Sequence, residues 1–212
     1  MQKSDATPRR KDRMVTDDLW IKEVLAYELF CTVSTVEGDQ PFLRPSAYYF
    51  SAADHAVYIH GAHSGRAIKN LNANPKICLS VFSVGAMRVH ERAFDFLQEH
   101  AGVMVFGTAS IVVDNAKKHE VMAGTFAKHA PHLTAGVDFQ PASQAEIDET
   151  TIIKISIDKW SGKMKWTDEP ERKRFRYEDV RKDVPAPYPW AKNSTTSAPL
   201  NMEWMHSTQD KS

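Results

Sequence analysis

The residues best suited to chemistry lie between positions 58 and 75, in the sequence YIHGAHSGRAIKNLNANP. The apolar residues before His60 predict a strand, and the small residues after it allow the backbone to turn tightly. Apolar spacing after the turn then predicts a short helix that ends at Pro75. The turn therefore places Ser64 and Arg66 at the N-terminus of a helix.

A helix N-terminus with a hydroxyl and a guanidinium beside it suits a phosphate monoester. Its free amide groups and the positive end of the helix dipole attract anions, and a guanidinium adds charge-assisted hydrogen bonds. Lys69 follows one turn later and can add a second cation. The alternative interpretation is an ordinary strand-to-helix turn whose Arg66 and Lys69 face water.

A second polar position interrupts the apolar segment 41–50, PFLRPSAYYF. Arg44 lies in the middle of this predicted strand, and Pro45 cannot donate a hydrogen bond to a neighbouring strand. These residues predict an edge strand, or a strand with one face against something other than its neighbours. A planar group can lie there, and the alternative is an edge strand with a surface arginine.

The rest of the chain must position these residues, and its pattern is mainly that of short antiparallel strands. No repeated strand–helix–strand unit is present, so a doubly wound parallel sheet is disfavoured and a small closed or split barrel is favoured. Strands are expected at 29–36, 41–50, 56–60, 76–84, 103–113 and 150–158. We expect a helix capped by Thr16 before these strands, and a second helix capped by Asp114 and ended by Pro131.

Segment 86–101 lies between two predicted strands and contains Phe94 and Phe96, which favour a helical excursion or lid over a plain loop. Residues 1–15 are polar and basic and are expected to form a flexible arm. Residues 168–212 are rich in charge, Pro, Ser and Thr and predict an extension after a domain at 16–167.

Composition excludes several classes of protein. The chain has 212 residues with 27 Lys+Arg and 27 Asp+Glu, so no net charge favours nucleic acid or an acidic membrane. No apolar run is long enough to span a bilayer and no secretory signal is visible, so a cytoplasmic protein is expected. Two cysteines, Cys31 and Cys78, make neither a disulfide framework nor a zinc set.

Nine histidines raise the question of a metal. His60 and His63 are three residues apart, as are His129 and His132, but no acidic or thiolate set completes either pair. We therefore predict no metal and expect hydrogen-bonded histidines. His60 is singled out because it ends a strand beside the proposed anion site.

The ordered set of motifs resembles the pyridoxamine 5'-phosphate oxidase-like family of FMN-binding split barrels, and is most similar to its nitroimidazole-reductase-like branch. An arginine in the second strand is followed by Tyr58-Ile59-His60, by a turn with Ser64 and Arg66, and by a helix that reaches Asn74-Pro75. The later segments VMVFGTASIVVD, KHAP and TTIIKISIDKWSGK are also similar. The resemblance covers roughly residues 18 to 167.

This resemblance implies a mostly β fold, a six-stranded antiparallel split β-barrel with peripheral helices, that binds FMN as a homodimer. The residues that it places at the cofactor are Arg44, Pro45, Ser46, Ala47, His60, Gly61, Ser64, Gly65, Arg66, Lys69, Trp160 and Lys163. Trp160 and Lys163 would approach the flavin from the other subunit. Ala67 stands where the oxidases have lysine, so that phosphate contact is kept only if Lys69 replaces it.

The function implied is an FMN-dependent oxidoreductase that passes electrons from NAD(P)H to a small organic acceptor, with His60 as the catalytic residue. The flavin would supply the redox chemistry, so few catalytic side chains are needed. The marks of elbow hydrolases, zincins and Rossmann proteins are absent. The alternatives are a non-catalytic flavin-binding or sensor protein, and a split barrel that binds deazaflavin F420 or haem.

Overall fold

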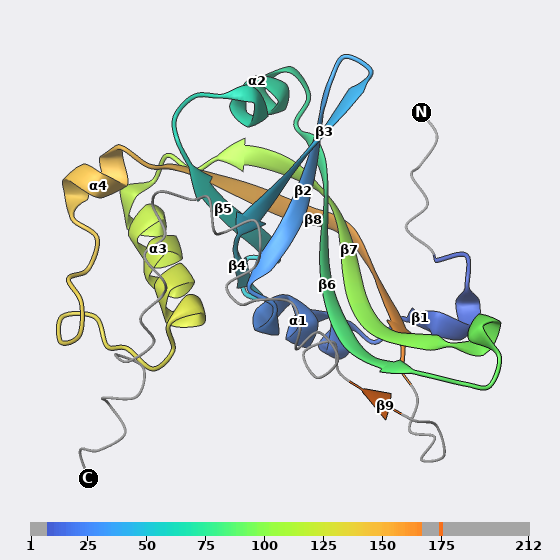
Figure 1. The fold of residues 1–212 in the computed structure, drawn as a ribbon. Helices are drawn as coiled ribbons and strands as arrows, with labels where there is room; N and C mark the ends of the chain where they lie inside the picture. Colours follow the sequence, from blue (N-terminus) through green and yellow to red (C-terminus); the bar gives the residue numbers. More distant parts are fainter. Residues whose placement is uncertain (1–7, 167–173, 176–212) are drawn as a thin grey trace, which may run out of the picture. The chain divides into compact units, whose positions relative to one another are not determined.

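A computed structural model describes residues 8–166 and 174–175 of the chain (Figure 1). The expected mostly antiparallel split barrel is confirmed. Its strands follow one another in the order β3-β2-β6-β7-β8-β5-β4. Their bounds are β2 (Phe30–Glu37), β3 (Gln40–Ala47), β4 (Tyr49–Ser51), β5 (Ala56–Gly61), β6 (Lys76–Arg88), β7 (Leu97–Ile111) and β8 (Thr151–Lys165).

The strands outnumber the six expected. The predicted strand 41–50 is broken at Tyr48 into β3 and β4, because the buried Tyr48 side chain turns aside and donates a hydrogen bond to the Leu25 carbonyl oxygen at 2.8 Å. Two further short strands pair outside the main order. They are β1 (Met14–Val15), which pairs with β8, and β9 (Arg174–Phe175), which pairs with β6.

The chain divides into two compact units, 1–85 with 98–168 and 86–97 with 169–212. In the second unit the helical excursion expected at 86–101 is wrong. Strand β6 continues to Arg88, β7 begins at Leu97, and only the single 3₁₀ turn η2 (Ala93–Asp95) lies between them. At the end of β6, Met87 pairs with Phe175 and Arg88 with Arg174 of β9. The predicted extension 168–212 lies outside the described residues except for β9.

The first unit has its main core inside the barrel. Alternate residues of the strands point inward and pack together, among them Cys31, Val33, Leu79, Val105 and Ile155. The alternation that predicted these strands is the pleat that separates the two faces of a sheet. A short segment of the predicted arm also belongs to this unit, since η1 (Lys11–Arg13) leads into β1.

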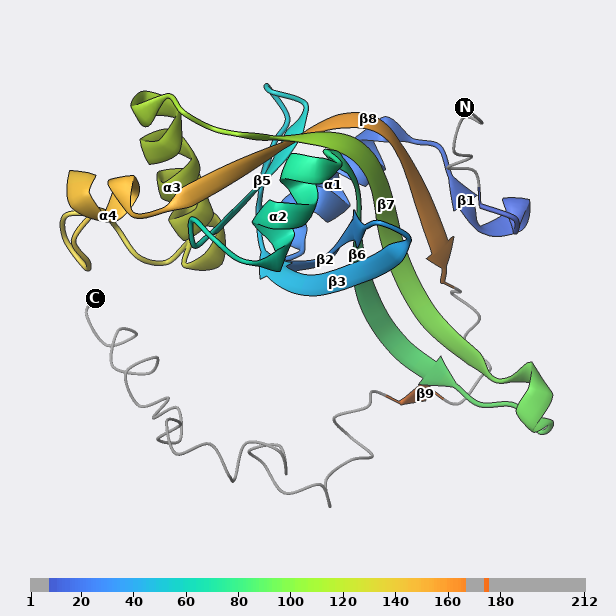
Figure 2. The same ribbon diagram turned by 90° about the horizontal axis from the view of Figure 1, so that it is seen from above.

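Four helices cover the barrel, namely α1 (Asp18–Tyr27), α2 (Arg66–Ala73), α3 (Asn115–His129) and α4 (Gln144–Asp148). Figures 1 and 2 show α1 and α2 at opposite ends of the barrel interior. A second apolar cluster lies under α3 and α4 and includes Tyr58, Val121 and Ile147. No helix in the described part of the chain is long and apolar enough to cross a membrane.

The helix caps are nearly as expected. The Asp114 carboxylate accepts a hydrogen bond from the Lys117 amide at 2.7 Å and begins α3, as predicted. At α1 the predicted cap Thr16 is wrong by one residue. Asp17 takes this position, and its carboxylate accepts from the Leu19 amide at 2.8 Å.

Candidate cofactor site

Arg44 points into the barrel. It lies directly opposite Val33 in the β2–β3 pairing, and residues that face each other across an antiparallel pair project to the same side of the sheet. Val33 is buried in the core, so Arg44 shares its inner face. The Nη2 atom of Arg44 lies 3.3 Å from Ser46 Oγ and 3.4 Å from the main-chain oxygen of His60.

Four predicted residues therefore meet at one place, which we call the Arg44 cluster: Arg44, Ser46, His60 and Gly61. A Cβ atom at Gly61 would lie 3.7 Å from both terminal nitrogens of the guanidinium, so the cation lies directly over that glycine. Pro45 and Ala47 belong to the other face of β3, because they alternate with Arg44 and Ser46. Only their backbone can reach a ligand that lies on the inner face.

The electrostatics of the Arg44 cluster favour an anion or a carbonyl-rich ligand. In the described part of the chain no carboxylate lies within ion-pair distance of Arg44, whose hydrogen bonds go to a hydroxyl and a carbonyl. Burial lowers the pKa of His60 below its ordinary value, and the positive charges of Arg44 and His129 lower it further. The imidazole of His60 is therefore neutral near pH 7 and can donate one hydrogen bond.

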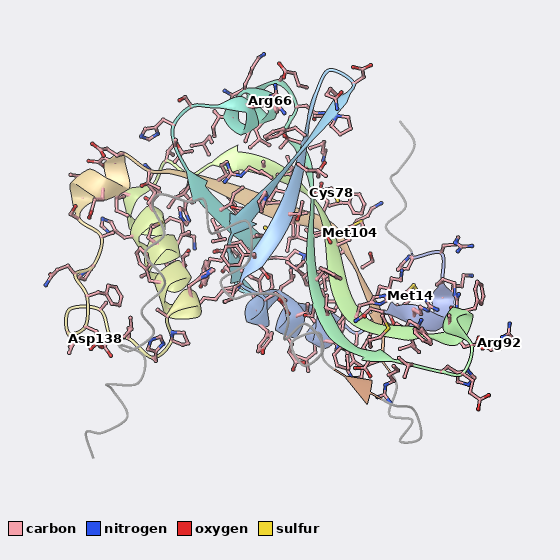
Figure 3. All side chains as sticks on the ribbon, viewed as in Figure 1. Met14, Arg66, Cys78, Arg92, Met104 and Asp138 are labelled. Atoms are coloured by element: carbon pink, nitrogen blue, oxygen red, sulfur yellow. The ribbon has the colours of Figure 1, made fainter. Side chains whose placement is uncertain are left out.

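The predicted phosphate turn has the expected backbone but also an unexpected partner. Gly65 precedes α2 with a φ of 124°, a conformation that favours glycine, and Ser64 is exposed beside it. Arg66 lies on α2 next to the tip of the β2–β3 hairpin (Figure 3). Its Nε atom lies 3.9 Å from a carboxylate oxygen of Glu37, and its guanidinium lies 5.3 Å from the centre of the Phe42 ring.

Lys69 also donates a hydrogen bond to Glu37, so one carboxylate binds both cations of the predicted phosphate site. The Lys69 bond is the main cause that holds the pKa of Glu37 below its usual range. Sequence reasoning missed Glu37, which lies between the expected strands 29–36 and 41–50. A phosphate at this turn would compete with the Glu37 carboxylate.

Trp160 and Lys163 do not join the Arg44 cluster within the chain. His60 pairs with Ile152 on β8, and Trp160 follows Ile152 by eight residues, which is about 26 Å along a strand. The Trp160 indole donates to an Asp18 carboxylate oxygen at 2.9 Å, and Lys163 lies opposite Met14 on the paired strands. Their approach to a flavin from another subunit stays a prediction.

Two basic residues that sequence reasoning left outside the site lie at the C-terminal end of α3. Lys128 donates to the Leu25 carbonyl oxygen at 3.0 Å and its Nζ lies 3.5 Å from the centre of the Tyr48 ring. Burial lowers the pKa of Lys128 to about 8. The Nε2 atom of His129 is buried and has no hydrogen-bond partner among the described residues.

Lys128 and His129 line an apolar groove of about 1000 Å³ between α3, the end of α1 and β4. The KHAP motif and the spacing of His129 and His132 were the sequence signals for these residues. The histidine pairs do not form a metal site in the described residues, where no group of three potential ligands is found. His63 instead contacts Thr151 Oγ1 at 2.6 Å and the Asp148 carbonyl oxygen at 2.9 Å.

Comparisons with known proteins agree with this architecture. The family model for pyridoxamine 5'-phosphate oxidase matches residues 17–164. Among solved structures, a flavocytochrome from Azotobacter vinelandii has 23% identity and a TM-score of 0.65, with 94% of each chain covered. An FAD- and haem-binding protein from Mycobacterium smegmatis has 19% identity and a TM-score of 0.64, and covers 91% of this chain and 97% of its own.

A third structure extends the comparison to the nitroimidazole branch. A candidate 5-nitroimidazole antibiotic resistance protein from Bacteroides thetaiotaomicron has 16% identity and a TM-score of 0.61, and covers 71% of this chain and 86% of its own. No curated protein sequence gives a significant match. At these identities the structural matches establish the fold.

Proposed function

Because the chain belongs to the pyridoxamine 5'-phosphate oxidase family, we propose that it is an FMN-dependent oxidoreductase that carries electrons from NAD(P)H to a small organic acceptor. The observation that supports this most is the Arg44 cluster, where an inward-facing guanidinium has no carboxylate partner in the described residues. Such a cation is costly to leave without an anionic or strongly polar ligand.

The residues present fit a flavin. Arg44, Ser46 and His60 would hold the ring system by hydrogen bonds to its carbonyl and nitrogen atoms, and Arg44 would stabilise negative charge on the reduced ring. The amides at the start of α2, with Ser64, Arg66 and Lys69, would hold the phosphate once Glu37 gives way. Bound flavin supplies the hydride and electron chemistry.

The chain's own residues would then bind and orient the flavin and the acceptor. Neutral His60 is suited to donate a hydrogen bond to the flavin edge or to the acceptor, since its pKa is lowered by burial and by the neighbouring cations. Gly65 leaves the backbone accessible to a ligand, since nothing lies within 4 Å of the place that a Cβ atom would take there. A homodimer would bring Trp160 and Lys163 of the second subunit to the same flavin.

The test uses the purified full-length chain. We expect flavin absorption bands in the isolated or FMN-reconstituted protein, release of FMN on heating, and bleaching of the bands by NADH or NADPH. Reoxidation by a nitroaromatic or quinone acceptor would complete the cycle. A protein that binds FMN but is reduced by neither nicotinamide is a binding or sensor protein. A protein whose spectrum does not change with FMN, FAD or F420 contradicts the proposal.

A second candidate function is a haem-binding flavoprotein. The Nε2 atom of His129 is buried, has no hydrogen-bond partner among the described residues, and lies beside the apolar groove. This arrangement favours haem binding, because an imidazole nitrogen is a common axial ligand of haem iron. Two structures with the same fold are described as a flavocytochrome and as an FAD- and haem-binding protein. A Soret band that appears on addition of haemin and is lost in His129→Ala would support this candidate.

A further inference from the structure

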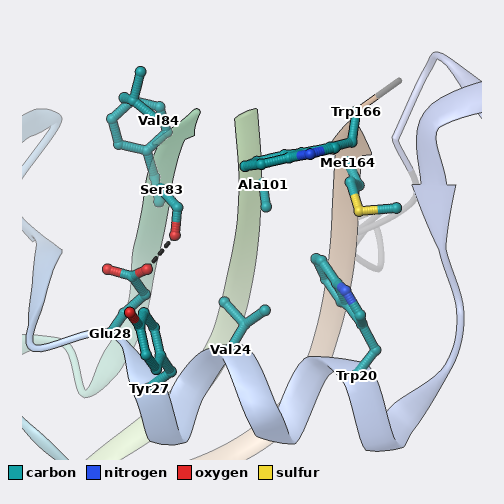
Figure 4. A pocket seen from close by; sticks show the side chains of 10 residues that line it. Trp20, Val24, Tyr27, Glu28, Ser83, Val84, Ala101, Met164 and Trp166 are labelled. Carbon is teal, nitrogen blue, oxygen red and sulfur yellow. Dashed lines mark hydrogen bonds between the residues drawn. The ribbon is translucent and has the colours of Figure 1, made fainter. Parts of the chain in front are cut away.

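A groove on the first unit lies away from the Arg44 cluster, between α1 and the strands β6, β7 and β8 (Figure 4). It has a volume of about 830 Å³. We call it the Trp166 groove, and it is lined by Trp20, Val24, Tyr27, Glu28, Phe82, Ser83, Val84, Ala101, Met164 and Trp166. Trp166 is the one lining residue that the family resemblance also implies at the flavin of a second subunit.

One wall of the Trp166 groove is a single face of α1. Trp20 and Val24 are separated by four residues, so they lie one above the other on the helix, and Glu28 follows at the same spacing. At 1.5 Å per residue this row is about 12 Å long. Figure 4 shows Trp20 at one end of the row and Glu28 at the other.

The wall opposite α1 includes Trp166. Figure 4 shows its ring lying across the strands above Ala101, with Met164 between it and Trp20. A Cβ atom at Gly85 would lie 2.6 Å from the Trp166 ring, so the absence of a side chain there is what allows the ring this position. The indole ring therefore forms an aromatic wall of the groove.

Several large apolar side chains that line the groove are exposed to solvent. Tyr27 is 82% exposed, Phe82 62%, Val84 50% and Trp166 44%. Exposed aliphatic and aromatic side chains that border one hollow are the usual lining of a binding site for an organic molecule.

The one carboxylate of the groove is Glu28, and in the described residues it forms no ion pair, although it interacts with the more distant Lys128. Its carboxylate accepts a hydrogen bond from the Ser83 hydroxyl. Among the described residues no basic side chain lies within ion-pair distance of it. Lys128, whose charge is felt by Glu28, donates instead to the Leu25 carbonyl oxygen. The remaining acceptor sites of the carboxylate are free for a ligand.

We propose that the Trp166 groove binds an organic cation with a flat apolar body. The body would lie along Val24 and Ala101 with the Trp166 ring and Met164 at its edge, and the ammonium group would lie at Glu28 beside the Tyr27 ring. Electron-rich aromatic faces and a carboxylate both attract a cation and repel an anion, so the groove selects by charge. The groove shares no residue with the Arg44 cluster.

The test is calorimetric titration of the full-length chain with 3-phenylpropyl-trimethylammonium. Two analogues of the same shape serve as probes of charge, one with carbon in place of the quaternary nitrogen and one with a carboxylate head. We expect saturable binding of the cation, weaker binding of the neutral analogue and none of the carboxylate. Equal binding of the cation and the neutral analogue would overturn the proposal.

Variants locate the site. Glu28→Gln is expected to weaken cation binding about fivefold, the effect of losing a partly exposed charge pair, whereas the exposed Glu23→Gln on the same helix leaves it unchanged. Trp166→Leu is expected to abolish binding. Because Trp166→Leu can also disturb folding, two variants of the exposed Val84 test the charge preference separately. Val84→Lys should weaken binding of the cation, and Val84→Glu should strengthen it. Indifference of binding to Glu28→Gln and to both Val84 variants contradicts the assignment.

The same titration is run across protein concentrations, with sedimentation to give the oligomeric state. If a second copy of the chain covers the groove, the cation will fail to bind wherever the dimer is populated, and that result also contradicts the proposal.

Discussion

The Nη2 atom of Arg44 lies 3.4 Å from the main-chain oxygen of His60, although their strands β3 and β5 are not neighbours in the sheet. The guanidinium thus spans the open side of the split barrel. Its contacts are neutral oxygen atoms, so its positive charge is kept inside the barrel and is available to a ligand.

Glu37 is expected to oppose phosphate binding at the start of α2. Because it binds both Arg66 and Lys69, Glu37→Gln should free these cations and strengthen FMN binding roughly threefold, the scale of an exposed ion pair. The measurement is quenching of FMN fluorescence by the full-length protein, with exposed Glu23→Gln as the control. Weaker binding in Glu37→Gln would show that the carboxylate supports the site.

Arg66 provides the complementary prediction. Its side chain is 61% exposed, so Arg66→Ala should weaken FMN binding by about 1.5 kcal/mol, the low end for a hydrogen bond to a charged group. The loss should be larger when Glu37 is already glutamine, because no carboxylate then competes for the guanidinium. A double-mutant cycle measures this coupling. Equal losses in both backgrounds would separate Glu37 from the phosphate site.

Lys128 predicts how the free energy of unfolding depends on pH. Its pKa is about 8 in the folded chain against 10.5 ordinarily, so the unfolded chain holds more protons between these values. Below pH 8 the buried, charged amine lowers the free energy of unfolding. As the pH rises from 8 to 10.5 the amine becomes neutral in the folded chain first, so the free energy of unfolding rises. The free energy of unfolding is measured in urea for the wild type and for two variants. The difference between the wild type and Lys128→Met should rise with pH, whereas the difference between the wild type and Lys118→Met should not. A flat difference for Lys128→Met contradicts the lowered pKa.

Gly107 tests the packing of the barrel. A Cβ atom there would lie 2.5 Å from the Ser156 carbonyl oxygen and 2.8 Å from the Ile155 side chain, at the point where the β7–β8 register shifts. Gly107→Ala should therefore lower the free energy of unfolding by about 1 to 3 kcal/mol, the usual cost of overpacking. Ser110→Ala, at an exposed position of the same strand, is the control. An unchanged unfolding midpoint in Gly107→Ala would mean that the strands relax freely.

The sequence predicted the barrel better than the length of its strands. Alternation at 150–158 marked the part of β8 that faces the core, but β8 continues to Lys165. Beyond the core, strand structure is maintained by backbone pairing with β7, which leaves no apolar pattern to detect. The hairpin of β6 and β7 was missed because the apolar residues Phe94 and Phe96 were interpreted as a helical excursion, whereas only the single 3₁₀ turn η2 lies there.

The candidate site was predicted where local sequence determines it. The turn after His60 and the start of α2 follow from small residues and helical spacing. Glu37, Lys128 and His129 were missed because only the folded chain brings the hairpin tip to α2 and the end of α3 to the Leu25 carbonyl oxygen. A salt bridge between residues 32 positions apart has no signature in one sequence.

The most direct test of the account is a titration of FMN into the full-length wild type and Arg44→Gln, followed by flavin fluorescence. Arg92, whose side chain is 76% exposed on the hairpin, provides the control Arg92→Gln. We predict saturable binding by the wild type and the control, and affinity lower by about tenfold or more in Arg44→Gln, since a charged hydrogen-bond donor is lost. Equal affinity in all three proteins, or no binding by the wild type, would contradict a flavin site at Arg44.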